Sequence, residues 1–202
     1  MSVLGVTTAT QSKWIAWLRR VGACGEAIAW CKTQPSKAAA WRSCERGDWM
    51  LWVISKTVGT PGDASRKPLI MAACECARLA LPYICAGEKR PLRSIEAVEA
   101  WCREEVTLDT VRSAAADAYA AATPASSAAA YFAAAATAAY ATAYANAFDV
   151  DAVDFAATYV VSAAAYASDA SEQATLQRCA DIARKHFPKP PRIPSAARRA
   201  GR

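Results

Sequence analysis

The residues of this chain that are able to do chemistry are its eight cysteines and a single histidine. A Ser–His–Asp or Cys–His nucleophile needs a histidine inside a site, but His186 stands beside Arg184 and Lys185 near the end of the sequence. The cysteines form no CxxC pair, whereas a zinc site needs clustered ligands at short spacing. We therefore predict buried, reduced thiols, with no catalytic residue, no metal and no cofactor.

Charged residues offer a second kind of chemistry, the recognition of a partner. No glycine-rich phosphate loop occurs in the sequence, so nothing indicates nucleotide binding. Asp48 precedes a Trp-rich segment, and Asp63 with Arg66 flanks the following turn; the favoured interpretation is a helix cap and a helix-start ion pair. The alternative is a polar recognition surface, whose candidate residues are Asp48, Asp63, Arg66, Arg78, Glu88, Arg90 and Glu96.

Helices would position these residues, because apolar residues recur at helical spacing and no strand pattern of comparable strength occurs. Ser36, Asp48 and Thr107 are suited to cap helices, and Pro68 to the first turn of one. We predict an all-α fold, a compact bundle of about nine or ten helices. The expected helices cover residues 12–21, 24–31, 36–45, 49–58, 64–81, 92–105, 107–123, an Ala-rich stretch after 126, a stretch that includes 155–166, and 171–187.

Two of the expected helices have a distinctive distribution of apolar residues. The run 49–54 is apolar nearly all round, which is typical of a buried helix. The last helix places small and apolar residues on one side, which predicts the face that it turns to the core. These residues are Leu176, Cys179, Ala180 and Ala183.

The composition is that of a globular protein, with 54% hydrophobic and 21% charged residues. About half of residues 114–167 are alanine, which favours close-packed helices, whereas every tryptophan lies before residue 102. We expect one domain over 1–187, with a Trp-rich half (12–105) and an Ala/Tyr-rich half (107–187). Because no run of about 18 large apolar residues and no secretory signal is found, we expect a cytoplasmic protein.

The end of the chain, residues 188–202, is a basic, proline-rich tail. The net charge is +6, and from residue 184 onward there are seven basic residues and no acidic one, so the preceding part is nearly neutral. The prolines forbid a helix, and we expect a disordered tail. Such a tail is able to meet nucleic acid or an acidic partner, and its candidate contacts are Arg192, Arg198, Arg199 and Arg202.

The most specific local motif is the run Gly47-Asp48-Trp49-Met50-Leu51-Trp52. Together with segments 22–30, 40–44, 77–78, 94–101 and 179–184, it resembles the immunity proteins of bacterial polymorphic-toxin systems, the immunity-protein-five-like family. The resemblance extends over residues 12–187.

This resemblance implies an all-helical, non-enzymatic protein that neutralises a cognate toxin by direct binding. Relatives of this kind also occur in bacteriophages, so the alternative is a phage-encoded accessory or anti-defence protein, which contacts nucleic acid through the basic tail. The expected partner is a toxin or defence protein, with no membrane and no small-molecule substrate. The nearly neutral body does not favour an inhibitor that mimics phosphate charge.

Overall fold

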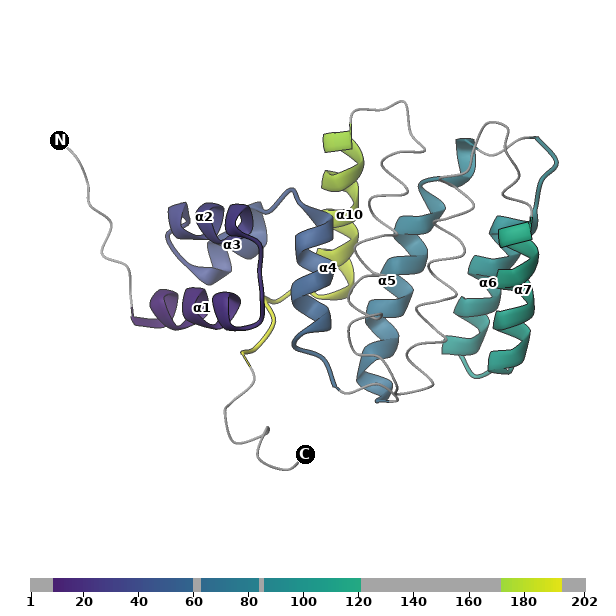
Figure 1. Cartoon of the computed structure of the whole chain (residues 1–202), viewed down its shortest axis with the longest axis horizontal. Helices are drawn as coiled ribbons and strands as arrows, with labels where there is room; N and C mark the ends of the chain where they lie inside the picture. The colour runs from purple at the N-terminus through teal and green to yellow at the C-terminus, as the bar shows by residue number, and fades with distance from the viewer. Residues whose placement is uncertain (1–8, 60–62, 84–85, 121–171, 194–202) are drawn as a thin grey trace.

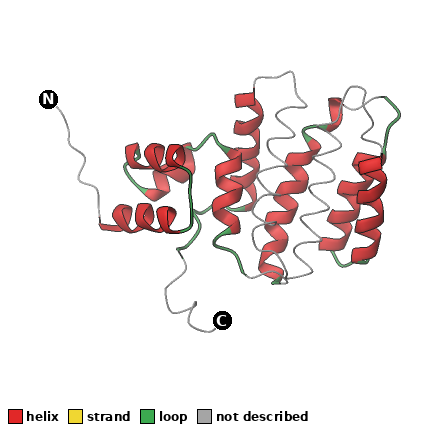
Figure 2. Ribbon diagram, in the orientation of Figure 1, coloured by secondary structure: helices red, strands yellow, loops and turns green. Residues whose placement is uncertain are grey.

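The computed structural model describes residues 9–59, 63–83, 86–120 and 172–193. These residues form helices joined by turns, with no strand among them (Figure 2). The α-helices are α1 (Ala9–Arg20), α2 (Gly25–Thr33), α3 (Lys37–Ser43), α4 (Gly47–Ser55), α5 (Lys67–Arg78), α6 (Arg90–Cys102), α7 (Leu108–Ala120) and α10 (Glu172–His186), and two 3-10 turns are η1 (Ala64–Arg66) and η2 (Leu81–Tyr83).

The predicted all-α class is confirmed for this part of the chain. It holds eight α-helices, fewer than the nine or ten that the sequence predicts for the whole chain. The Ala-rich helix expected after residue 126 and the helix expected around 155–166 lie outside the described residues. None of the helices in the described ranges has the length and apolarity needed to cross a membrane.

Most of the helix starts follow from local sequence. The Ser36 hydroxyl accepts a hydrogen bond from the Ala39 amide at 3.1 Å, as expected of the α3 cap. Pro68 lies in the first turn of α5, where its missing N–H costs nothing. Asp48, however, does not cap α4: the helix begins at Gly47, its N-cap is Arg46, and Asp48 lies within the first turn. A carboxylate is favourable there because it faces the positive end of the helix dipole.

Helices α4, α10, α5, α6 and α7 follow one another across the molecule (Figure 1). Helix α10 packs on α4 and α5, α5 packs on α6, and α6 packs on α7. The last helix of the described chain therefore lies between α4 and α5. The three short helices α1–α3 lie at one end of the molecule, beside α4 (Figure 1).

The contact between α4 and α10 is close because both helices present small residues. A Cβ atom on Gly47 would lie 2.7 Å from the backbone nitrogen of Ala180, inside van der Waals contact. The face of α10 that the sequence predicts to be buried is confirmed: Cys179, Ala180 and Ala183 are fully buried and Leu176 is buried. These small side chains let the helices approach, and dispersion contacts then stabilise the pair.

The tryptophans divide between the core and its border. Trp14, Trp17 and Trp41 are buried, whereas Trp49 and Trp52 are half-buried and pack against the core. The expectation that the 49–54 run is buried all round is therefore only partly correct, since Met50, Leu51, Val53 and Ile54 are buried but the two indoles are not. Both indoles face a cavity between α4 and the α1–α3 helices.

Candidate functional site

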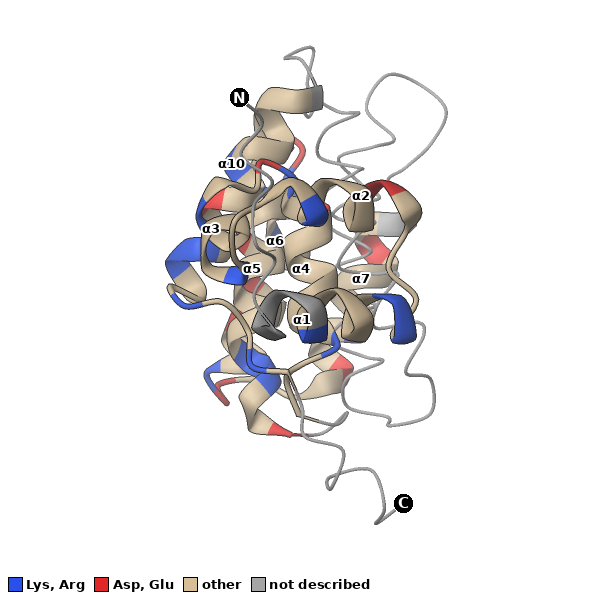
Figure 3. Cartoon of the chain, turned by 90° about the vertical axis from the view of Figure 1, so that its left-hand side faces the viewer, with Lys and Arg blue, Asp and Glu red and all other residues tan. Residues whose placement is uncertain are grey.

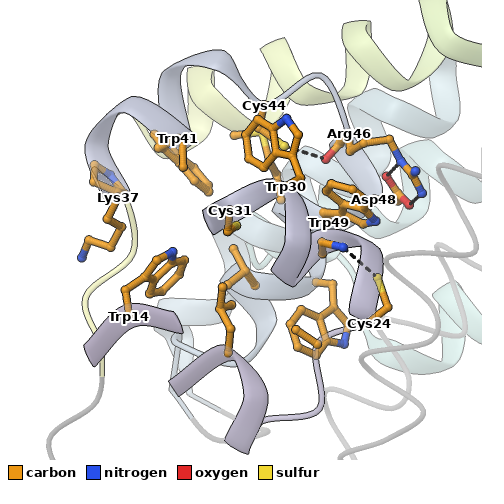
Figure 4. A pocket seen from close by; sticks show the side chains of 18 of the residues that line it. Trp14, Cys24, Trp30, Cys31, Lys37, Trp41, Cys44, Arg46, Asp48 and Trp49 are labelled. Carbon is orange, nitrogen blue, oxygen red and sulfur yellow. Dashed lines mark hydrogen bonds and ion pairs between the residues drawn. The ribbon is translucent and has the colours of Figure 1, made fainter. Parts of the chain in front are cut away.

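A cavity of about 350 Å³ lies between the α1–α3 helices and α4 (Figure 4). Its volume is within the usual range for small-molecule sites. Five indoles form much of its wall, together with aliphatic side chains from all four helices. The aromatic and aliphatic residues that line it are Trp14, Trp30, Trp41, Trp49, Trp52, Leu18, Ala27, Ala40, Met50 and Val53.

Hydrogen bonds to α10 and to the segment after it hold the walls of the cavity in place. The Trp41 indole N–H donates to the Phe187 carbonyl at 3.0 Å. The Arg184 guanidinium donates to the Cys44 carbonyl at 2.7 Å and to the Trp41 carbonyl at 3.3 Å. These bonds satisfy the carbonyls at the end of α3, which have no partner inside the helix. The end of α3 is therefore tied to α10, far away in the sequence.

One end of the cavity is basic. The Lys37 ammonium lies 5.5 Å from the centre of the Trp14 ring and donates to the Pro191 carbonyl at 3.0 Å. Burial lowers the pKa of Lys37. Pro190 lines the cavity, so the first residues of the predicted tail, up to Ile193, lie against the body of the protein.

The other end holds an ion pair on an aromatic face. The Arg46 guanidinium makes two hydrogen bonds to the Asp48 carboxylate, of 2.9 and 2.7 Å, and lies 4.3 Å from the centre of the Trp49 ring. The hydrogen bonding of Arg46 to the accepting Asp48 carboxylate is the main reason why the pKa of Arg46 is raised. The planar guanidinium thus makes two hydrogen bonds to one carboxylate and also lies as a cation on an aromatic ring. Its partner Asp48 is thereby fixed inside the wall.

Three cysteines also line the cavity, and two of them, Cys31 and Cys44, are not suited to nucleophilic chemistry. Burial raises the pKa of Cys31 to about 11, and burial also raises the pKa of Cys44. A thiol with such a pKa stays protonated near neutral pH, and the thiolate is the reactive form. Cysteines in the described residues are free, as predicted, but Cys24 is exposed and Cys102 is half-buried.

The single histidine lies away from the cavity. His186 Nε2 is 3.0 Å from a carboxylate oxygen of Glu75, which also accepts from Lys185 at 2.7 Å. Within the described ranges, no three His, Cys, Asp or Glu residues are grouped in a way that could hold a metal ion. The histidine is thus part of an ion-pair network between α5 and α10.

A shallow groove lies on the outer side of the cavity wall. The rings of Trp30 and Trp49 are 6.1 Å apart at its base, tilted by 57°. Arg46 is shared by the groove and the cavity. The groove combines exposed carboxylates, amides and two indole edges, and its lining residues are Glu26, Trp30, Gln34, Ser43, Cys44, Glu45, Arg46, Trp49 and Gln173.

Of the seven residues predicted to form a polar surface, only Asp48 lies at the cavity. Asp63 accepts from the Ser65 amide at 2.8 Å as the cap of η1. Arg66 is buried and donates to the Gly59 carbonyl at 2.8 Å. These two residues therefore have structural partners in the turn between α4 and α5.

The remaining predicted residues lie on or before α6. Arg78 makes a bidentate pair with Glu99, at 2.9 and 2.8 Å, which joins α5 to α6. Glu88, in the loop before α6, pairs with Arg90, the first residue of that helix. Glu96 is exposed on α6. In the tail, Arg192 is exposed, and Arg198, Arg199 and Arg202 lie outside the described residues.

Sequence reasoning missed Lys37, Arg46 and the cavity itself. The signal that was present is the clustering of tryptophan in the first part of the chain. Tryptophans at helical spacing are typical of core packing, and Trp14 and Trp41 are indeed buried. Nothing in the local pattern separates an indole that fills a core from one that borders a cavity, because both positions are apolar and recur at the same helical spacing.

Comparison with known proteins identifies a family. The family model described as Imm-5 like putative immunity protein matches residues 59–185, more than half of the chain. No curated protein and no solved structure matches. The matched residues include α5, α6, α7 and most of α10.

Proposed function

Because the chain belongs to the Imm-5 like putative immunity protein family, we propose that it acts without catalysis, by binding a protein, and that this protein is a cognate toxin. The raised pKa of Cys31 and of Cys44 and the distance of His186 from the cavity support a non-enzymatic role, since neither of these thiols is poised as a nucleophile and no histidine lines the cavity. Binding alone is then the means by which the toxin is neutralised.

The observation that carries the proposed binding surface is the Arg46–Trp49 stack beside Trp30. Tryptophan and arginine are the residue types that most often dominate binding energy at protein interfaces. Here the guanidinium is already held by Asp48, and Trp49 is held between Arg46 and Trp30. A surface that is ordered before binding loses less conformational entropy on association. We therefore assign the groove as the surface that contacts the toxin.

The charge around this groove indicates what the partner presents to it. Glu26 and Glu45 line it and are exposed, and Arg46 is already paired with Asp48 at 2.7 Å and with Glu26 at 3.4 Å. The groove therefore complements a basic surface on the toxin. Such charge complementarity raises the rate of association, and this acceleration weakens as the salt concentration rises.

The experiment is a growth rescue in bacteria. Each candidate toxin encoded by the same genome is co-expressed with this chain, and relief of toxicity is scored together with co-purification of the two proteins. Glu45→Lys reverses a charge on the groove, and Glu96→Lys makes the same change on the exposed face of α6. We expect rescue by the natural chain, weaker rescue by Glu45→Lys and full rescue by Glu96→Lys.

Two results would contradict the proposal. If no toxin is relieved, the immunity function is wrong. If Glu96→Lys abolishes rescue and Glu45→Lys does not, the toxin is bound at the α6 surface, and the assignment of the groove as the binding surface is wrong. Circular dichroism of both variants checks that they fold.

A further inference from the structure

We propose that the tryptophan-lined cavity is a binding site for a small apolar ligand that carries an anionic group. The ligand is distinct from the toxin partner, and the cavity is distinct from the groove, although Trp30, Trp49 and Arg46 contribute to both. All residues that line the cavity lie outside the matched range 59–185. The inference therefore goes beyond the proposed immunity function.

The size and the lining of the cavity indicate the size and the polarity of the main part of the ligand. A volume of about 350 Å³ accommodates a compact aromatic or branched aliphatic molecule. Indoles, a thioether and aliphatic side chains surround that volume. The transfer of apolar ligand surface from water into the cavity is therefore favourable.

The acceptors at the cavity are already occupied. Both carboxylate oxygens of Asp48 accept from Arg46. The Cys24 sulfur accepts from the Ala27 amide at 3.4 Å. For a ligand that donates a hydrogen bond or carries a positive charge, these two acceptor groups already have partners within the protein.

The cationic alternative is also disfavoured by the indoles themselves. An aromatic cage binds a cation through open ring faces. Here the protein's own cations lie over three of these rings: Lys37 over Trp14 at 5.5 Å, Arg46 over Trp49 at 4.3 Å, and Lys56 over Trp52 at 5.6 Å. A ligand cation would meet like charge at each of them.

The groups with unused hydrogen-bonding capacity are donors. The Trp14 side chain is buried, at 5% exposure, and within the described residues its indole N–H finds no oxygen or nitrogen acceptor, only the weakly accepting thiol of Cys31. A buried donor without a strong acceptor costs free energy, which an acceptor on a ligand would recover. The Lys37 ammonium carries three N–H donors, and one of them donates to the Pro191 carbonyl. Trp14 and Lys37 lie at the same end of the cavity (Figure 4).

The charge of the surrounding surface agrees with an anion. Lys37, Arg46 and Asp48 are the charged residues of the lining, and the Arg46–Asp48 pair leaves the Lys37 charge uncompensated within it. Helix α1, which supplies Trp14 and Leu18, carries exposed basic residues and no acidic one (Figure 3). The local potential therefore attracts an anion to this wall.

The test compares two probes with the same aromatic body. Anilinonaphthalene sulfonate carries an anionic group, and N-phenylnaphthylamine is the same ring system without it. Each is titrated into the full-length protein, with probe fluorescence, quenching of tryptophan emission and calorimetric stoichiometry as readouts. We expect one site per chain and about tenfold tighter binding of the sulfonate, because a charge-assisted hydrogen bond is added.

Four variants locate the site. Lys37→Met removes the charge and keeps the length of the side chain, and Lys32→Met makes the same change at an exposed position of α2. Ala27→Leu fills the cavity, and Ala16→Leu is its exposed counterpart on α1. We expect Lys37→Met to remove the preference for the sulfonate, Ala27→Leu to weaken both probes at least tenfold, and the two exposed variants to bind like the natural chain.

The proposal is overturned if the probes bind without saturation, if they bind equally to the natural chain, or if Lys37→Met keeps the preference. A cooperative thermal transition is required of each variant, and Ala40→Leu replaces Ala27→Leu if the latter fails to fold. Probe binding needs no toxin, and growth rescue needs no probe. Failure of this proposal is therefore distinguishable from failure of the immunity function.

Discussion

Gly47 and Cys179 meet where α4 crosses α10, so closely that the glycine has no room for a side chain. The sequence places these residues more than a hundred positions apart, and the contact joins the Trp-rich part of the chain to its last helix. Because α4 also forms one wall of the cavity, this crossing fixes the position of that wall relative to α10.

Gly47→Ala is expected to destabilise the protein by about 1–3 kcal/mol, since the added methyl group overpacks a backbone contact. Gly25→Ala is the matched control, because Gly25 is also helical and has open space around its Cβ position. That change is expected to be neutral or to stabilise by about 0.5–1 kcal/mol, through the higher helix propensity of alanine. Urea unfolding of both variants measures the difference, and equal midpoints would refute the close contact.

Acid is expected to weaken the ion-pair network between α5 and α10. Burial raises the pKa of Glu75, but hydrogen bonds from Lys185 and His186 outweigh this, so the pKa lies below its ordinary value of 4.5. A carboxyl whose pKa is lowered by folding stabilises the native state above that ordinary value, and the contribution is lost as the pH falls through the lowered pKa.

Glu75→Gln isolates this contribution. At neutral pH the natural chain is expected to melt at a higher temperature than the variant, and the gap is expected to close below about pH 4. Thermal scans of both proteins across the acidic range provide the measurement. A gap that stays constant from neutral to acidic pH would show that the Glu75 charge contributes nothing.

The rate at which each cysteine is labelled is expected to rise with the exposure of its thiol. Cys24 is exposed, whereas burial raises the pKa of Cys31 and of Cys102 to about 11. At neutral pH the reactive thiolate is therefore scarce at the buried positions. Iodoacetamide followed by peptide mass spectrometry should find Cys24 modified before Cys31, and labelling in denaturant gives the reference rates. Modification of Cys31 first would contradict the closed wall of the cavity.

Two truncations are expected to differ in stability. Removing 188–202 deletes Pro190 from the cavity wall and the Pro191 carbonyl that accepts from Lys37. We expect a loss of about 1–2 kcal/mol, from one hydrogen bond and some apolar contact. Removing only 194–202 is expected to leave the free energy of unfolding unchanged. Chemical denaturation compares the two chains, and an equal loss in both would contradict the assigned contacts.

The shorter truncation also separates the two functional hypotheses. It deletes Arg198, Arg199 and Arg202, three of the four candidate nucleic-acid contacts, and keeps Arg192. If the chain acts by binding a toxin through the groove, growth rescue is expected to be unchanged. Loss of rescue together with loss of salt-sensitive DNA or RNA binding would instead favour the tail as the functional element.

Helix positions and some buried faces were predictable because they depend on neighbours in the sequence. Ser36 caps α3 through an amide three residues away, and Pro68 fits the first turn of α5 because that position needs no N–H. The buried side of α10 follows from the spacing of Leu176, Cys179 and Ala183 along one helix. Each of these depends on the 3.6-residue period or on a bond within one turn.

The sequence alone therefore determined that the chain is helical, where most of the described helices lie, and that no catalytic motif is present. Tertiary structure decided which side chains meet: Arg46 rather than a backbone amide became the partner of Asp48, and Arg184 reached the Cys44 carbonyl across more than a hundred residues. The cavity belongs to this second class, because four helices and the segment after α10 must converge before Trp14 and Lys37 share a wall. Local periodicity states that a residue is apolar, but only the packing of distant elements decides whether it faces a neighbour or an open volume.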